Sequence, residues 1–244
     1  MYPFSDQFIA EPGQLDFLRA TMMGPNAMRI SEEMASCLPI QQDMRILDLG
    51  CGCGLSTYLL IKKYGVTVFA ADLWVTPTEN HERFQSLGID DKAVPLFLDA
   101  TKGLPFANGY FDVLFSVDAY HYFGRTPEML PSLIPHVKKG GYIAVAIPGW
   151  KKELENGIPA ELKPYFSDFS EDNAETFQSV AWWKNLWSNT DGIELIDCRE
   201  MACNRQAWEE WLASPSPYAV QDRGIMEAEQ GRYFALISLI AKVV

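Results

Sequence analysis

Short apolar runs alternate with helical patterns from residue 45 to the end of the chain. Bounded by glycines, prolines or charged residues, these runs are typical of strands buried in a sheet. The strands predicted in this way are Arg45–Leu49, Val66–Ala71, Val94–Leu98, Val113–Val117, Tyr142–Ile147, Ile193–Arg199 and Tyr233–Val243. The helices predicted between them include Leu55–Tyr64, Met129–Val137 and Ser179–Trp187. Such alternation predicts one α/β domain with parallel strands and helices on both faces.

Three segments lie outside this alternation. Residues 1–43 have apolar residues at helical spacing on both sides of a Gly24-Pro25-Asn26 break, which predicts helices before the first strand. Residues 150–178 and 203–231 are polar, charged and aromatic. We expect a single domain over residues 1–244, with an N-terminal helical segment 1–43 and two lid-like insertions at 150–178 and 203–231.

The residues most informative about chemistry follow the first strand. Asp48-Leu49-Gly50-Cys51-Gly52-Cys53-Gly54 is a glycine-rich turn, which lets the backbone pass close to a ligand before a helix N-terminus. Asp72 ends the next apolar run, where a carboxylate suits the two hydroxyls of a ribose. Leu55 replaces the third glycine of a dinucleotide fingerprint, and the chain has no P-loop. This favours a nucleoside cofactor without phosphate, of which S-adenosylmethionine (SAM) is the common one.

The glycine-rich turn resembles motif I of the class I SAM-dependent methyltransferases, and Asp72 resembles their ribose-binding acid. The segments Leu98-Asp99-Ala100, Leu104-Pro105-Phe106 and Gly109-Tyr110-Phe111-Asp112-Val113 resemble the next landmarks of the small-molecule, methyltransferase type 11-like branch. The resemblance covers roughly Met44 to Pro148. It implies a Rossmann-like, seven-stranded, mostly parallel sheet with an antiparallel last strand, and methyl transfer from SAM to a small molecule.

The same resemblance points to the residues that hold the cofactor. Asp72 is expected on the ribose, Asp99 on the adenine amine and Trp74 beside the adenine plane. The full set expected to bind the cofactor is Asp48, Gly50, Cys51, Gly52, Gly54, Asp72, Leu73, Trp74, Asp99, Ala100 and Ser116. Simpler roles stay open: Asp72 as the N-cap of a helix at 76–83, Asp99 as a solvent-facing loop acid, and Trp74 as a packing residue.

The acceptor side is expected in the segment 116–123, which follows the fourth strand. His121 is the first candidate for a catalytic base, because an unperturbed histidine has a pKa of about 6.5. Tyr120 and Tyr122 complete the predicted catalytic set, either as hydrogen-bond donors or as walls. A histidine that hydrogen-bonds the backbone and only shapes the pocket is the alternative for His121. Methyl transfer depends mainly on alignment, so a base is needed only if the acceptor loses a proton.

Aromatic residues gather in and around the two insertions. They are Trp150, Tyr165, Phe166, Trp182, Trp183, Trp187, Trp208 and Trp211. Packing onto the sheet is the default for Trp183 and Trp187. Others can form a pocket wall that encloses a flat substrate or holds a cationic amine, and the sequence does not separate these two possibilities.

Composition narrows the partners. A formal net charge of -12 argues against nucleic acid, whose phosphates require clustered Lys and Arg. No apolar stretch approaches the roughly 20 residues of a membrane span. Residues Met1 to Asp6 do not resemble a signal peptide, and the cysteine count of five is odd; both favour the cytoplasm. Cys51 and Cys53 have no nearby ligand partner, so we expect no metal site.

Rival functions remain open. One is a SAM enzyme that forms cyclopropane rings on lipid acyl chains, although the chain shows no basic amphipathic membrane helix. Another is a SAM-binding regulatory protein that transfers nothing. A nicotinamide dehydrogenase is the third, and Leu55 in place of a glycine counts against it.

Overall fold

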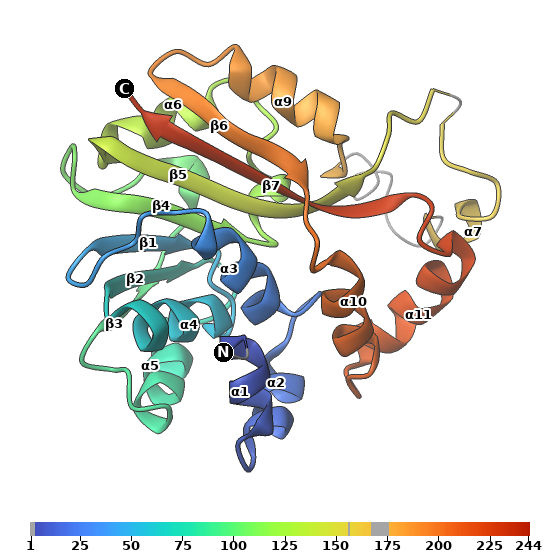
Figure 1. Cartoon of the computed structure of the whole chain (residues 1–244), viewed down its shortest axis with the longest axis horizontal. Helices are drawn as coiled ribbons and strands as arrows, with labels where there is room; N and C mark the ends of the chain where they lie inside the picture. The colour runs from blue at the N-terminus through green and yellow to red at the C-terminus, as the bar shows by residue number, and fades with distance from the viewer. Residues whose placement is uncertain (1–2, 156, 167–175) are drawn as a thin grey trace.

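The computed structural model describes residues 3–155, 157–166 and 176–244 (Figure 1). In this part of the chain seven strands form one sheet in the order β3-β2-β1-β4-β5-β7-β6. The strands are β1 Arg45–Leu49, β2 Thr67–Asp72, β3 Ala93–Phe97, β4 Phe111–Val117, β5 Val137–Trp150, β6 Ile193–Glu200 and β7 Phe234–Val243. β1 to β5 pair in parallel, whereas β7 runs antiparallel to both β5 and β6. The predicted fold class is confirmed.

One predicted element differs clearly from the structure. The helix expected over Met129–Val137 is α6 Met129–Leu133 followed by the 3-10 turn Ile134–His136, and Val137 already belongs to β5. Pro135 lies in that turn and has no N–H to donate, so it cannot continue an α-helical ladder. β5 is therefore longer than predicted, and Val137 pairs with Phe111 of β4.

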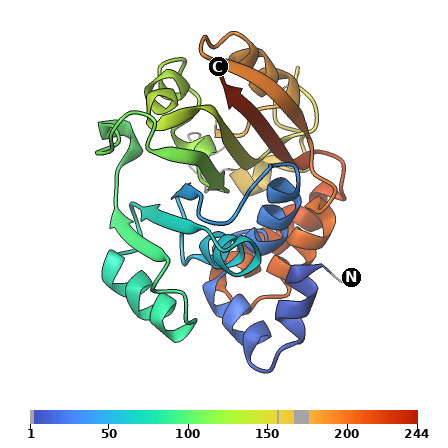
Figure 2. The same ribbon diagram turned by 60° about the vertical axis from the view of Figure 1, so that its left-hand side comes forward.

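Helices cover both faces of the sheet, as the turned view makes clear (Figure 2). The helices of the described residues are α1 Phe4–Ala10, α2 Gln14–Thr21, α3 Ala27–Ser36, α4 Leu55–Tyr64, α5 Pro77–Ser86, α6, α7 Lys163–Phe166, α9 Val180–Ser188, α10 Asn204–Leu212 and α11 Pro217–Glu229. α9 packs against β6 and β7, with the side chains of Trp183 and Trp187 fully buried beneath it. The packing role expected for these two tryptophans is thus observed.

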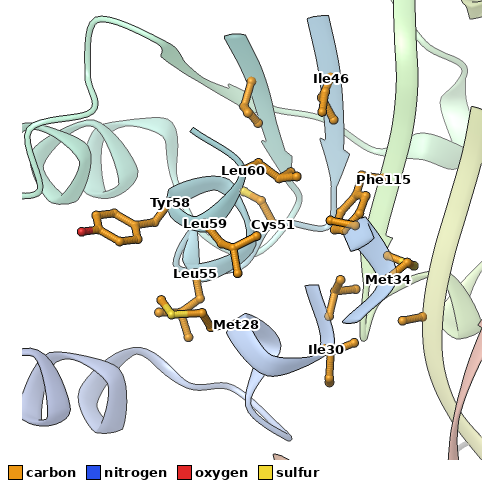
Figure 3. Close-up of a cluster of buried hydrophobic side chains, with 14 of the residues drawn as sticks. Met28, Ile30, Met34, Ile46, Cys51, Leu55, Tyr58, Leu59, Leu60 and Phe115 are labelled. Atoms are coloured by element: carbon orange, nitrogen blue, oxygen red, sulfur yellow. The ribbon is translucent and has the colours of Figure 1, made fainter. Parts of the chain in front are cut away.

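The opposite face of the sheet is covered by α3 and α4, whose apolar side chains meet in one core (Figure 3). Residues from α3, α4 and two strands contribute to it, among them Met28, Ile30, Met34, Leu55, Leu59, Leu60, Ile46 and Phe115. α3 begins after Asn26, whose side chain accepts a hydrogen bond from the Met28 N–H. This packing fixes the start of α3 beside the glycine-rich turn.

The segment 203–231 forms α10 and α11, and α10 lies against α3 (Figure 1). The Arg29 guanidinium donates to the Glu210 carboxylate from Nε at 3.1 Å and from Nη2 at 2.6 Å, and it also pairs with Asp6. The Asn26 side chain donates to the same Glu210 carboxylate at 2.6 Å. A buried cation therefore joins the N-terminal helices to α10.

Replacing Arg29 with Met is expected to lower the free energy of unfolding by about 3 kcal/mol, since Glu210 and Asp6 lose the cation between them. Arg205→Met is the control on α10, because its pair with Glu209 is 88% and 59% exposed. We expect that exposed ion pair to contribute nothing measurable to the free energy of unfolding. Urea unfolding of both variants tests this expectation, and equal midpoints for the two variants would contradict it.

Candidate active site

A cavity of about 330 Å³ opens at the carboxyl ends of β1, β2 and β4. β1 pairs with β2 on one side and with β4 on the other, so the strand order reverses at this point. Open α/β sheets bind their ligands at such a switch point. We call this space the first cavity. Its walls come from the segments 21–27, 49–56, 72–74, 98–101 and 117–123.

The glycine-rich turn lines the first cavity through Gly50, Cys51 and Gly52. Gly50 has φ +75°, and a Cβ on it would lie 2.2 Å from the Cβ of Ala119. No other residue fits here, because both the left-handed backbone and the close approach exclude a side chain. Gly54 was expected to bind cofactor, but it does not line the cavity. It is the N-cap of α4, where the ring of Phe84 covers it.

Replacing Gly50 with Ala is expected to lower stability by at least about 2 kcal/mol more than Gly140→Ala. Both substitutions strain the backbone, but only the one at Gly50 also forces a methyl group against Ala119. Gly140 has φ +81°, and a Cβ on it would meet no atom within 4 Å, so it controls for backbone strain alone. Thermal unfolding measures the stability difference. Similar losses of stability in both variants would show that Ala119 can shift to make room at little cost.

Asp72 joins the glycine-rich turn to the loop after β2. Its carboxylate accepts hydrogen bonds from the backbone N–H groups of Gly52 at 2.8 Å, Trp74 at 2.7 Å and Val75 at 2.8 Å. The side chain also lines the first cavity. The alternative role as a helix cap is wrong, because α5 is capped by Thr76 in a capping box with Glu79.

Leu73, Trp74, Asp99 and Ala100 also line the first cavity. The Trp74 side chain is 67% exposed, so it stands on the rim instead of in the core. The Asp99 carboxylate accepts from the N–H and hydroxyl of Thr101, and the hydroxyl bond lowers the pKa of Asp99. Asp99 is therefore a charged acceptor at the cavity edge. Contact of these residues with cofactor stays a prediction.

Two residues expected on the cofactor lie behind the cavity instead. Asp48 is fully buried and accepts hydrogen bonds from the hydroxyls of Ser56 and Thr57 at 2.6 Å each. Burial raises the pKa of this carboxyl to about 6. Ser116 is also fully buried, and its hydroxyl donates to the Leu49 carbonyl at 2.6 Å. Both residues hold the end of β1 in place and do not line the cavity.

A second cavity of about 310 Å³ adjoins the first. The two share Met23, Gly24, Pro25, Asp118 and Tyr122 in their walls. Most of its other walls come from Pro148 in β5, from Phe166, Thr176 and Phe177, and from the two helices α10 and α11. Both predicted insertions thus supply side chains to it. Their role as lids is untested and stays a prediction.

The predicted catalytic residues separate in the structure. Tyr120 is fully buried against Phe123, Trp183 and Trp187 and lines neither cavity, so the catalytic role expected for it does not fit. Tyr122 lines both cavities, with its ring 5.4 Å from that of Trp74. Burial raises the pKa of Tyr122 to about 12, which keeps its hydroxyl protonated.

His121 lines the second cavity but not the first, and only 1% of its surface is exposed. Desolvation by burial, with a smaller contribution from the charge of Arg125, lowers the pKa of His121 to about 3. Its Nδ1 has no hydrogen-bond partner among the described residues. A neutral imidazole with so low a pKa is a weak base, so His121 fits that expected role poorly.

Asp118 is the acid that sequence analysis did not single out. It lies where the two cavities meet, has φ +56°, and its Oδ2 packs against the backbone of Gly24. Burial, assisted by the charge of Asp222, raises the pKa of Asp118 to about 7. A carboxylate in this range can accept a proton at neutral pH. Its position directly after β4 was the available signal, but nothing in the spacing of residues ranks it above His121.

Replacing His121 with Asn is expected to leave the pH dependence of turnover unchanged between about pH 5 and about pH 9, because a group with a pKa near 3 does not titrate there. We expect a change mainly in KM for the acceptor. Turnover at several pH values measures both. Loss of the wild-type pH dependence in this variant would restore His121 as the base.

The described residues include no group of three or more His, Cys, Asp or Glu side chains that could hold a metal ion. Among these residues, no helix is both long and apolar enough to cross a membrane. All five cysteines are free thiols, including Cys51 and Cys53 in the glycine-rich turn.

Residues 46–141 match a family model described as a methyltransferase domain. Residues 46–141 therefore form a methyltransferase domain. The family resemblance inferred from the glycine-rich turn, Asp72 and the later landmarks is thus confirmed. The match begins in β1 and ends in β5, so it contains the strands whose carboxyl ends form the first cavity.

Curated relatives match this chain over part of their length. The 2-methyl-6-phytyl-1,4-hydroquinone methyltransferase of Synechocystis sp. is 31% identical over 114 residues, which are 47% of this chain and 34% of that protein. The sarcosine/dimethylglycine N-methyltransferase of Aphanothece halophytica is 31% identical over 115 residues, which are 47% of this chain and 41% of that protein. The chain therefore spans less than half the length of these relatives.

Solved structures of methyltransferases share the fold. A geranyl diphosphate methyltransferase in complex with SAM has a TM-score of 0.72 at 16% identity, covering 98% of this chain and 95% of that one. A putative sarcosine dimethylglycine methyltransferase from Galdieria sulphuraria has a TM-score of 0.69 at 16% identity, and the match covers 89% of this chain and 86% of that one. At this identity the likeness concerns the fold alone.

Proposed function

We propose that this protein transfers a methyl group from SAM to a small-molecule acceptor, with the cofactor in the first cavity and the acceptor in the second. The observation that carries the proposal is the junction of the two cavities at Asp118 and Tyr122. A methyl donor on one side of this junction and a nucleophile on the other would meet in line, which is the main requirement of the reaction.

The residues of the first cavity fit SAM by their chemistry. The glycine-rich turn offers a backbone surface without side chains, Asp72 offers a carboxylate for ribose hydroxyls, and Asp99 and Trp74 offer an acceptor and a ring for adenine. When bound, SAM supplies a methyl carbon activated by the attached sulfonium. Met23 and Tyr122 lie between the two cavities and would exclude water there. Asp118 would accept a proton from an acceptor that must lose one.

The rival functions are less well supported. The second cavity is an open space lined by His121, Asp118 and aromatic rings, whereas a regulatory protein that transfers nothing would have an occluded acceptor site. We propose a cytoplasmic location because all five cysteines are free. The net charge of -12 makes nucleic acid an unsuitable acceptor.

Calorimetric titration with SAM and with S-adenosylhomocysteine tests the cofactor half of the proposal. We expect binding with a Kd on the order of 1 to 100 μM, which corresponds to a favourable binding free energy of about 5.5 to 8 kcal/mol. Incubation of the protein with methyl-labelled SAM and a mixed set of small amines, alcohols and acids tests transfer. Absence of cofactor binding at high micromolar concentration would overturn the proposal, and label found only in phospholipid vesicles would favour the cyclopropane-forming alternative.

A further inference from the structure

Two acids line the second cavity, and neither has a Lys or Arg partner among the described residues. Asp118 follows β4 and Asp222 lies in α11, and both side chains face this cavity. Among its described lining residues there is no Lys or Arg. Burial raises the pKa of each carboxyl, and the charge of Asp222 adds to the effect on Asp118. Two carboxylates in one desolvated space repel each other, and a bound cation would relieve that repulsion.

The hydrogen bonds of the two acids leave room for a ligand. Asp222 accepts one hydrogen bond from the indole N–H of Trp211 at 2.7 Å. No described residue donates a hydrogen bond to the Asp118 side chain. The Nδ1 atom of His121, whose side chain lines the same cavity, is buried and has no described hydrogen-bond partner. Unfilled acceptors on a cavity wall favour a ligand that brings N–H donors or positive charge.

Aromatic rings enclose the same space. They belong to Tyr122, Phe166, Phe177, Trp208, Trp211, Tyr218 and Phe234. Trp211 is 1% exposed, and its bond to Asp222 fixes a ring and a carboxylate next to each other. Aromatic faces attract ammonium groups through their quadrupoles, most strongly in desolvated sites. The buried indole N–H of Trp208 has no described partner.

We propose that the second cavity recognises an acceptor that carries a positively charged amine, placed between Asp118 and Asp222 and against the rings of Trp208 and Trp211. This inference rests on the proposed function and names the substrate class for it. A neutral isoprenoid or an anionic acceptor would leave both acids without a partner and would bind weakly.

Choline tests the inference against 3,3-dimethylbutan-1-ol, which has the same shape with carbon in place of the charged nitrogen. Both are titrated calorimetrically into protein saturated with S-adenosylhomocysteine. Choline is expected to bind at least 10-fold more tightly than the neutral alcohol. Asp222→Asn should weaken choline binding about 10-fold and leave the neutral alcohol within about twofold, since only the charged ligand uses the carboxylate. Asp191→Asn, in an exposed turn before β6, is the matched control and should change neither the affinity for choline nor that for the neutral alcohol.

Asp118→Asn provides a second variant in case Asp222→Asn disturbs the packing of Trp211, and thermal unfolding shows which variants are folded. Choline affinity equal to that of the neutral alcohol, or choline binding unchanged in both folded acid variants, would overturn the inference. Failure of S-adenosylhomocysteine to bind would instead overturn the proposed function. The two failures are therefore distinguishable in the same titrations.

Discussion

Replacing Asp72 with Asn is expected to weaken binding of S-adenosylhomocysteine at least about 100-fold, the equivalent of one or two hydrogen bonds to a charged group. The two carboxylate oxygens of Asp72 accept three backbone N–H groups, from Gly52, Trp74 and Val75. In Asn one oxygen becomes an NH₂ group, which faces a backbone donor in either orientation. The glycine-rich turn or the loop after β2 must then move, and the cavity loses the carboxylate expected on the ribose.

Calorimetry measures this loss, and Asp99→Asn serves as the matched control. Among the described residues the Asp99 carboxylate bonds to Thr101 of its own loop, and Asn would keep one side-chain oxygen for the adenine amine, so we expect this variant to bind within about 10-fold of the wild type. Circular dichroism checks that both variants are folded. A folded Asp72→Asn protein with wild-type affinity would show that the cofactor does not use this acid.

Asp118→Asn is expected to reduce turnover about 100-fold or more while S-adenosylhomocysteine binding changes little, because a positioned proton acceptor contributes at least this much. The pKa of Asp118 is raised to about 7, so wild-type turnover should rise as pH increases through about 7 and level off above it. The variant should lack this rise. Initial rates across the pH range measure the effect, and an unchanged profile would exclude Asp118 as the base.

Asp118→Asn should also change how the stability of the protein depends on pH. In the unfolded chain the Asp118 carboxyl ionises near its ordinary pKa of 3.8, whereas burial raises the folded value to about 7. The folded state therefore holds the proton more tightly, and stability is lost as pH rises from about 4 through about 7. Asp118→Asn should gain stability relative to wild type at high pH, but not at pH values below about 4. Thermal melts at both ends of the range test this; a pH-independent difference would contradict it.

Much of the fold followed from local pattern. Arg45–Leu49 and Leu55–Tyr64 form the strand and helix predicted from the sequence, because apolar runs and the glycine turn between them specify backbone geometry locally. Pro135 limited this success: it lies in a 3-10 turn and has no N–H to donate, so the helix predicted over Met129–Val137 ends before it. The glycine-rich turn and Asp72 were likewise identifiable, because their spacing reflects backbone contacts within a single strand–helix–strand unit.

The spacing of residues along the chain, together with the family resemblance that it carries, was enough to predict the sheet, its glycine-rich turn and the class of cofactor. The burial of Asp48, Ser116 and Tyr120 behind the site, and the desolvation that makes His121 a poor base, emerged only from the folded structure. Folding also brings Asp118 and Asp222 to one cavity from segments far apart in the chain. Burial and the charges of distant neighbours set the pKa of a side chain, and neither is visible in local sequence patterns.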